Sequence, residues 1–157
     1  IARLVGSEMC IRDSTNILLY YLNNTTTAKQ IEQRYNLLSF KKRQVISVVS
    51  LGEIKSLAKR RNWGIKKLNR LFKLLESFIV ADINVEEIIE RYAEIDAFSQ
   101  GKLIDKTAKF SAKNMGKNDV WIAATASVLD IILITTDKDF NHLDKEYLNL
   151  KLIDLKN

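Results

Sequence analysis

Short apolar runs alternate along the chain with longer stretches of helical periodicity, a pattern typical of strands separated by helices. Three brief apolar runs, at residues 45–49, 78–83 and 131–135, predict buried strands. Residues 150–155 alternate between apolar and polar types and predict a last edge strand. Strands that alternate with helices form parallel sheets covered on both faces, so we expect an α/β protein with a mostly parallel central sheet.

The segments between these strands carry apolar residues at helical spacing and are expected to be helical, over residues 17–22, 28–38, 50–61, 68–75, 84–98 and 119–129. Ser50 and Glu53 form a Ser-x-x-Glu pattern, which predicts that a helix begins at Ser50. Asn84 and Asn118 are predicted to cap two later helices. Residues 137–144 suit a turn or a short helix, and residues 2–12 show no clear periodicity.

Three acidic residues fall where predicted strands and helices meet. Glu53 follows the first predicted strand, Asp119 begins a predicted helix, and Asp137 follows the third predicted strand. Binding sites in open α/β sheets form beyond the carboxyl ends of the strands, so all three acids are expected at one edge of the sheet.

Carboxylates held close together repel one another, and such a cluster usually needs a divalent cation. Ligands that are all oxygen suit Mg²⁺ or Mn²⁺, which activate water and neutralise charge on a phosphodiester. Each acid also has a simpler interpretation: Glu53 completes a capping box, Asp119 favours a helix N-terminus, and Asp137 starts a turn. The metal-site prediction therefore depends on all three acids recurring at equivalent junctions.

Composition narrows the class of protein further. The 157 residues fit one domain, and 46% hydrophobic residues are enough for a core. The net charge of +6 favours a polyanionic partner, although a modest basic excess also serves solubility. The longest apolar run, residues 17–22, is far too short to span a membrane. One cysteine and no secretory leader predict a cytoplasmic protein.

The start of the chain has an unusual character. It begins at Ile1, and residues 6–14 resemble translated sequencing-adaptor sequence. We therefore treat residues 1–157 as one domain in which residues 1–13 are a leader that is partly foreign to the native protein.

Four segments in order resemble the PIN domain, specifically the VapC-like toxins of bacterial and archaeal toxin–antitoxin pairs. The most specific segment is Asn-Asp-Val-Trp-Ile-Ala-Ala-Thr-Ala at residues 118–126. Leu-Ile-Thr-Thr-Asp-Lys-Asp-Phe follows at residues 133–140, at the spacing that the family shows. Residues 46–54 are similar to the family's strand and acidic helix start, and residues 15–18 to the tail of its opening motif.

This resemblance implies a PIN-like three-layer α/β/α sandwich that cleaves RNA with Mg²⁺ or Mn²⁺. By position, Glu53, Asp119 and Asp137 would be three of four acidic metal ligands. Asn16 and Thr135 or Thr136 would support them, and Asp139 is a weaker candidate. The implied partners are an antitoxin protein, a second copy of the chain in a homodimer, and a structured RNA such as tRNA or rRNA.

The fourth acid departs from the family's commonest pattern, which has Asp directly before Thr-Asn. Here Ser14 stands at that position and Asp13 lies one residue earlier, a shift that turns a strand side chain to the opposite face. A looser family pattern, Asp followed by two small polar residues, puts Asp13 in register as the fourth metal ligand.

Two other functions are alternatives to the ribonuclease. One is a catalytically impaired PIN-like module that binds RNA or a partner protein, which the residue at position 14 favours. The other is an Asp-based phosphotransfer domain, which would need a paired-acid motif that residues 13–15 lack.

Basic residues near the acids are candidates for RNA contacts. Lysines line the approach to Asp119, and of these we select Lys113 and Lys117 as RNA-binding residues. A second basic group, residues 59–61, ends the helix of Glu53. His142, the single histidine, has no cysteine or second histidine nearby and is expected to be a surface residue rather than a catalytic base.

Overall fold

The computed structural model describes residues 9–12, 15–38 and 43–155, and for residues 9–12 it describes the backbone alone. Five strands in this part of the chain form one sheet in the order β3-β2-β1-β4-β5, with every neighbouring pair parallel. The strands are β1 (Met9–Arg12), β2 (Arg43–Ser47), β3 (Phe78–Ala81), β4 (Ile132–Thr135) and β5 (Asn149–Leu152). The predicted parallel α/β sheet is confirmed.

The central strand β1 was missed by the sequence pattern. Its backbone pairs with β2 on one side, where Cys10 is level with Gln44, and with β4 on the other, where Cys10 is level with Ile132. Four residues of mixed type are too few to show a period of two, so hydrogen bonding to both neighbours defines this strand. The foreign origin of the leader stays a prediction, but residues 9–12 lie in the middle of the sheet.

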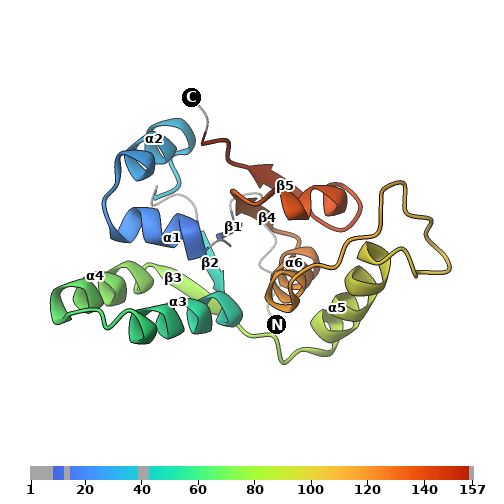
Figure 1. The fold of residues 1–157 in the computed structure, drawn as a ribbon, viewed down its shortest axis with the longest axis horizontal. Coiled ribbons are helices and arrows are strands. Elements are labelled where there is room, and N and C mark those ends of the chain that lie inside the picture. The colour runs from blue at the N-terminus through green and yellow to red at the C-terminus, as the bar shows by residue number, and fades with distance from the viewer. Residues whose placement is uncertain (1–8, 13–14, 39–42, 156–157) are drawn as a thin grey trace.

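Helices cover both faces of the sheet, which confirms the three-layer sandwich (Figure 1). One face carries α1 (Thr15–Leu22), α2 (Thr26–Tyr35), α3 (Val48–Arg60) and α4 (Ile65–Leu75), and the other carries α5 (Glu86–Ser99) and α6 (Lys117–Leu129). The alternation of side chains along β2 builds both cores, because Val45 packs with the α5 and α6 side and Ile46 packs with α3 and α4. A 3₁₀ helix, η1 (Lys138–Leu143), follows β4.

Three predicted helix starts are wrong by one to three residues. Ser47 caps α3 by accepting a hydrogen bond from the Val49 amide at 3.2 Å, and Ser50 is buried inside the helix. Serine is a favoured N-cap residue at either position, and Ser47 becomes the cap because β2 ends there and the helix begins at the next residue. The residue before α5 is Val85 rather than Asn84, and the residue before α6 is Gly116 rather than Asn118.

The strand order reverses beside β1, because the chain first builds outward to β2 and β3 and then returns to place β4 on the other side. Such a switch point opens a crevice beyond the carboxyl ends of the two central strands. The chain leaves β4 toward Asp137 and leaves β2 into α3, which carries Glu53. The topology therefore directs the predicted acids to one crevice.

Among the described residues, no helix is both long and apolar enough to cross a lipid bilayer.

Candidate functional site

Glu53 lies in the second turn of α3, where two other helices contact its carboxylate. The Thr15 hydroxyl at the start of α1 donates a hydrogen bond to Oε2 at 2.8 Å. The Asn118 amide of α6 donates to Oε1 at 2.5 Å. Glu53 is thus fixed from two sides and keeps lone pairs on both oxygens for a further ligand. Thr15 and Asn118 are site residues that sequence reasoning did not assign, since only the folded chain brings them to Glu53.

Asp119 occupies the first turn of α6 and is half-buried. Burial, and after it the negative charges of Asp137, Glu53 and Asp139, together raise the pKa of its carboxyl to about 6. Gly116 makes room for this carboxylate, because a Cβ at that position would lie only 3.0 Å from Asp119 Oδ2. The structure therefore gathers the predicted acids around Asp119, and their repulsion is what a bound cation would relieve.

Asp137 lies two residues after the end of β4 and is held by its own turn. The Asp137 amide donates a hydrogen bond to the hydroxyl of the buried Thr135 at 3.0 Å. Thr135, a predicted supporting residue, therefore contacts Asp137 directly. The Oδ1 of Asp137 accepts a hydrogen bond from the Asp139 amide at 2.8 Å. Asp137 thus caps η1, as the simpler interpretation had it, and also adds its charge to the environment of Asp119.

The remaining predicted site residues differ in how exposed they are and in how near they lie to the acids in the sequence. Asn16 is exposed in the first turn of α1, directly after Thr15, and Thr136 is half-buried beside Asp137. Lys117 is exposed at the start of α6, two residues before Asp119, and Lys113 is half-buried. Asp13 lies outside the described residues. The RNA-binding and metal-binding roles of these residues stay predictions.

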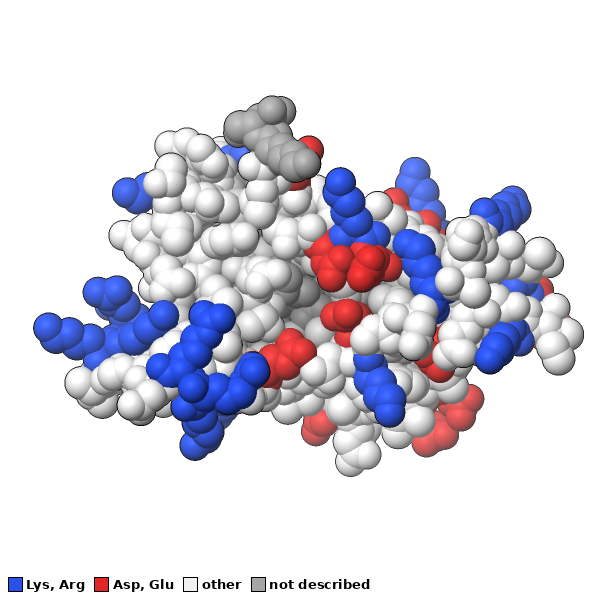
Figure 2. All heavy atoms as spheres, in the orientation of Figure 1, with Lys and Arg blue, Asp and Glu red and all other residues white. Residues whose placement is uncertain are grey.

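Figure 2 shows acidic side chains around a hollow in the middle of one face, with lysine and arginine side chains on both sides of it. Within the described residues, no three acidic, histidine or cysteine side chains form a ready-made metal-binding group. A site with only a few carboxylate ligands suits Mg²⁺, because this ion commonly binds one or two carboxylates together with several waters and substrate phosphates. The donor set fits such an ion, since it consists of carboxylates with unused lone pairs.

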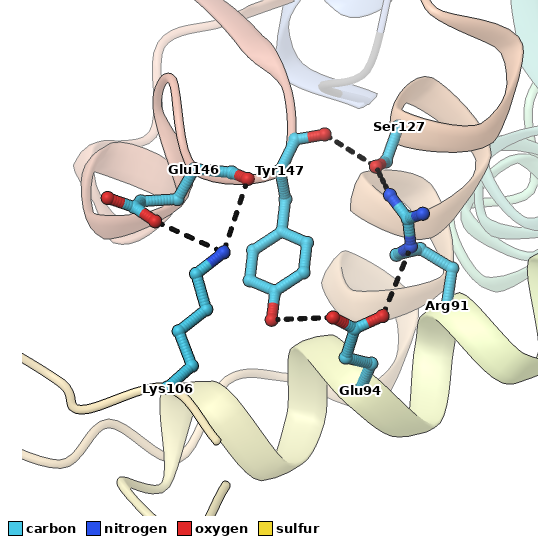
Figure 3. A network of polar contacts seen from close by, with 6 residues as sticks. All are labelled: Arg91, Glu94, Lys106, Ser127, Glu146 and Tyr147. Atoms are coloured by element: carbon cyan, nitrogen blue, oxygen red, sulfur yellow. Dashed lines mark hydrogen bonds and ion pairs between the residues drawn. The ribbon is translucent and has the colours of Figure 1, made fainter.

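The lysine-rich segment between α5 and α6 is anchored at Lys106 (Figure 3). Lys106 Nζ forms an ion pair with Glu146 Oε2 at 3.1 Å and lies 4.2 Å from the centroid of the Tyr147 ring. The Tyr147 hydroxyl donates to Glu94 of α5 at 3.1 Å, and its carbonyl accepts from Ser127 of α6. These contacts join α5, α6 and the segment before β5, so the segment that leads to Lys113 and Asp119 has a fixed start.

His142 is not the surface residue that was expected. It is half-buried, with Nε2 2.7 Å from the Ser99 hydroxyl and its ring centroid 4.8 Å from that of Phe110. Burial and the nearby positive charge of Lys113 lower the pKa of its imidazole. Aromatic partners distant in sequence create this environment, which local sequence does not reveal. The residue ties η1 to α5 and so helps to position Asp137.

The contact between Thr15 and Glu53 gives a first testable expectation. Thr15→Val keeps the β-branched shape but removes the donor, so Glu53 loses one of its two orienting hydrogen bonds. Loss of such a supporting contact typically lowers metal affinity or activity by about tenfold or more. We expect a fall of about tenfold in Mn²⁺ affinity, measured by calorimetry, and in RNA cleavage.

Thr15→Ser is the matched control, since it restores the hydroxyl and should keep both properties near those of the parent chain. Equal behaviour of the valine and serine variants would show that the hydrogen bond has no role in the site.

Comparisons with known proteins agree with this geometry. The family model of the PIN domain matches residues 14–146. A chain in the structure of VapBC2 from Rickettsia felis bound to a DNA fragment from its promoter is similar to this chain with a TM-score of 0.70 and 21% identity, over 93% of this chain and 99% of that one. A chain of VapBC-1 from nontypeable Haemophilus influenzae is similar with a TM-score of 0.64 and 22% identity, over 92% of this chain and 97% of that one.

A chain of a toxin–antitoxin complex from Klebsiella pneumoniae has the higher identity of 26%, with a TM-score of 0.58, over 83% of this chain and 89% of that one. A search among curated proteins found no match.

Proposed function

Since the chain belongs to the PIN domain family, we propose that it is a Mg²⁺- or Mn²⁺-dependent endoribonuclease and the toxin of a toxin–antitoxin pair. The observation that carries the proposal is the environment of Asp119, whose pKa is raised to about 6 by burial and by three neighbouring carboxylates. A group of like charges around a half-buried carboxylate is costly unless it serves to bind a cation. Its place at the switch point of a parallel sheet supports a binding site.

In this proposal Glu53, Asp119 and Asp137 are the catalytic acids, and with Asp13 they hold the metal. The bound ion would supply a nucleophilic water and neutralise charge on the scissile phosphate. Thr15 and Asn118 keep the Glu53 carboxylate aimed into the crevice, and Thr135 holds the turn of Asp137. Asn16 and Thr136 are supporting residues, and Lys113 and Lys117 contact the RNA backbone.

The proposed partners follow from the relatives. The similar chains come from VapBC complexes and from a toxin–antitoxin complex, which supports an antitoxin protein as the partner of this chain. We further propose a homodimer that acts in the cytoplasm on a structured RNA such as tRNA or rRNA.

The test is cleavage of a total RNA pool by the purified chain with Mn²⁺, and with Mg²⁺ in parallel. We expect discrete RNA fragments that disappear with EDTA and return when excess Mn²⁺ is added. A DNA pool of matched length is the control and should remain intact. RNA cleavage that persists in EDTA would contradict metal dependence, and the absence of cleavage with either ion would contradict the enzyme.

The second candidate function is a catalytically impaired module that binds RNA or a partner. Ser14 favours it, because the commonest family pattern has an acid at that position. RNA cleavage by variants of residues 13 and 14 distinguishes the two functions.

A further inference from the structure

A groove with a volume of about 690 Å³ opens from the acidic site along one side of α3. Glu53, Thr15 and Asn118 line its inner end, and Arg60 lines it further along the helix. Ser56 and Leu57 line it between Glu53 and Arg60, and Val48 and Gly52 line it on the N-terminal side of Glu53; all four are apolar or small. The groove is therefore continuous with the proposed reaction centre and has a cationic group at some distance from it.

Helical geometry fixes the distance between the two ends. Arg60 lies seven residues after Glu53, which is about two turns, so both side chains emerge on the same side of α3 about 10 Å apart along its axis. Arg60 is exposed, and within the described part of the chain no acidic side chain forms an ion pair with it. Its guanidinium is available to an external anion.

We propose that this groove holds the RNA strand on one side of the cleavage point, and that Arg60 binds a phosphate near the scissile one. The inference rests on the proposed ribonuclease function. A stacked strand rises about 3.4 Å per nucleotide, so a separation of about 10 Å places the contacted phosphate between about one and three nucleotides from the reaction centre. Arg is well suited to this role, since its planar fork donates two hydrogen bonds to one phosphate.

The shape of the groove agrees with a nucleic-acid strand. A Cβ added at Gly52 would contact nothing within 4 Å, so the groove is open at this position. Val48 and Val49 offer apolar contact for sugars and bases, and Glu53 and Arg60 are the charged residues among those that line the groove. A substrate whose scissile phosphate lies at Glu53 would place its neighbouring phosphates along this groove, within reach of Arg60.

Binding without cleavage tests the role of Arg60. A short fluorescein-labelled single-stranded RNA is titrated with the Asp119→Asn chain, which is expected to be inactive, over a series of KCl concentrations. Adding Arg60→Ala should weaken binding about five- to tenfold and reduce the slope of log K against log salt by about 0.7, the value for one phosphate contact on a single strand.

Lys55→Ala is the matched control, because it removes the same charge from the exposed, opposite side of α3. It should change affinity less than about twofold. Equal losses from Arg60→Ala and Lys55→Ala would overturn the proposal in favour of general electrostatic attraction. Affinity that is unchanged by Arg60→Ala would overturn it in favour of another occupant, such as a protein partner, and so would a failure to bind RNA.

A matched pair at Gly52 tests the groove itself. Gly52→Glu and Gly52→Gln have nearly the same size and differ in charge, and a Cβ at this position meets nothing within 4 Å. If the groove holds phosphates, the glutamate variant should bind the RNA at least about fivefold more weakly than the glutamine variant. Equal affinity of the two variants would place the strand elsewhere.

A kinetic comparison separates this inference from the proposed function. In the otherwise unchanged chain, Arg60→Ala should raise KM for the oligonucleotide and leave kcat nearly unaltered. A dinucleotide has a single phosphodiester and cannot reach Arg60, so its cleavage should not change. A parent chain that cleaves no RNA would contradict the proposed ribonuclease function. The binding titrations would still test whether the groove holds RNA.

Discussion

Asp119→Asn is expected to abolish RNA cleavage and, at the same time, to stabilise the metal-free protein. The substitution removes the charge of a proposed metal ligand at the centre of the acidic site and keeps the shape of the side chain. A metal ion that polarises the phosphate and activates water contributes several kcal/mol to catalysis, so we expect a loss of about a thousandfold in the rate of cleavage. The rate is measured with Mn²⁺ on the RNA pool.

The gain in stability follows from the pKa of Asp119. Its folded-state value of about 6 lies above the ordinary value of 3.8, so ionisation of this group opposes folding. The penalty is absent below about pH 4, grows as the pH rises, and is complete above about pH 6. Two pKa units correspond to about 3 kcal/mol, and since water still reaches Asp119 we expect about half of that at pH 8.

The measurement is chemical denaturation in EDTA at pH 8 and at pH 4. The free energy of unfolding of Asp119→Asn should exceed that of the parent chain by about 1–2 kcal/mol at pH 8, and the difference should vanish at pH 4. Asp105→Asn is the control, because Asp105 is an exposed acid in the segment before α6 and should show no such gain. A variant that is less stable at pH 8 would contradict the repulsion inferred at this site.

Addition of Mn²⁺ should reverse the order of stability. A cation that binds only the folded parent chain stabilises it by about 2.7 kcal/mol at a concentration one hundred times its Kd. The asparagine variant should gain much less. Equal stabilisation of both chains would place the metal away from Asp119.

The layout of the site could be predicted because it depends on chain connectivity. The buried runs that became β2 and β4 are recognisable from composition, and an acid after each of them must reach the same edge of a parallel sheet. Asp119 was included in the predicted site because it is an acid at the start of a predicted helix. The structure places its charge beside those of Glu53 and Asp137, as expected.

What sequence reasoning missed depends on contacts between distant residues. β1 is a strand because β2 and β4 pair with it, and its own four residues have no strand pattern. Asparagine is a favoured helix cap, but Gly116 precedes α6 as the cap, and the side-chain amide of Asn118 donates to Glu53 instead. His142 is half-buried against aromatic residues that local sequence does not place near it. These features follow from the tertiary fold rather than from a local signal.

Asp13→Asn is expected to reduce RNA cleavage about a hundredfold or more, because it removes the proposed fourth ligand. β1 ends at Arg12 and α1 begins at Thr15, so residues 13 and 14 connect the central strand to the helix that supplies the Thr15 hydroxyl to Glu53. The crevice at the switch point lies beyond the carboxyl end of β1, and Asp13 is the first residue after that strand in the sequence. Loss of a carboxylate there weakens metal binding, which cleavage and Mn²⁺ calorimetry both measure.

Ser14→Asp is the companion variant, since it supplies the acid of the commonest family pattern. If Asp13 holds the metal, Ser14→Asp should change cleavage by less than about threefold, because a carboxylate is already in place. A parent chain without activity that gains cleavage through Ser14→Asp, and loses it again through Asp119→Asn, would contradict the role of Asp13. That result would instead establish the impaired module, with a serine where the metal requires an acid.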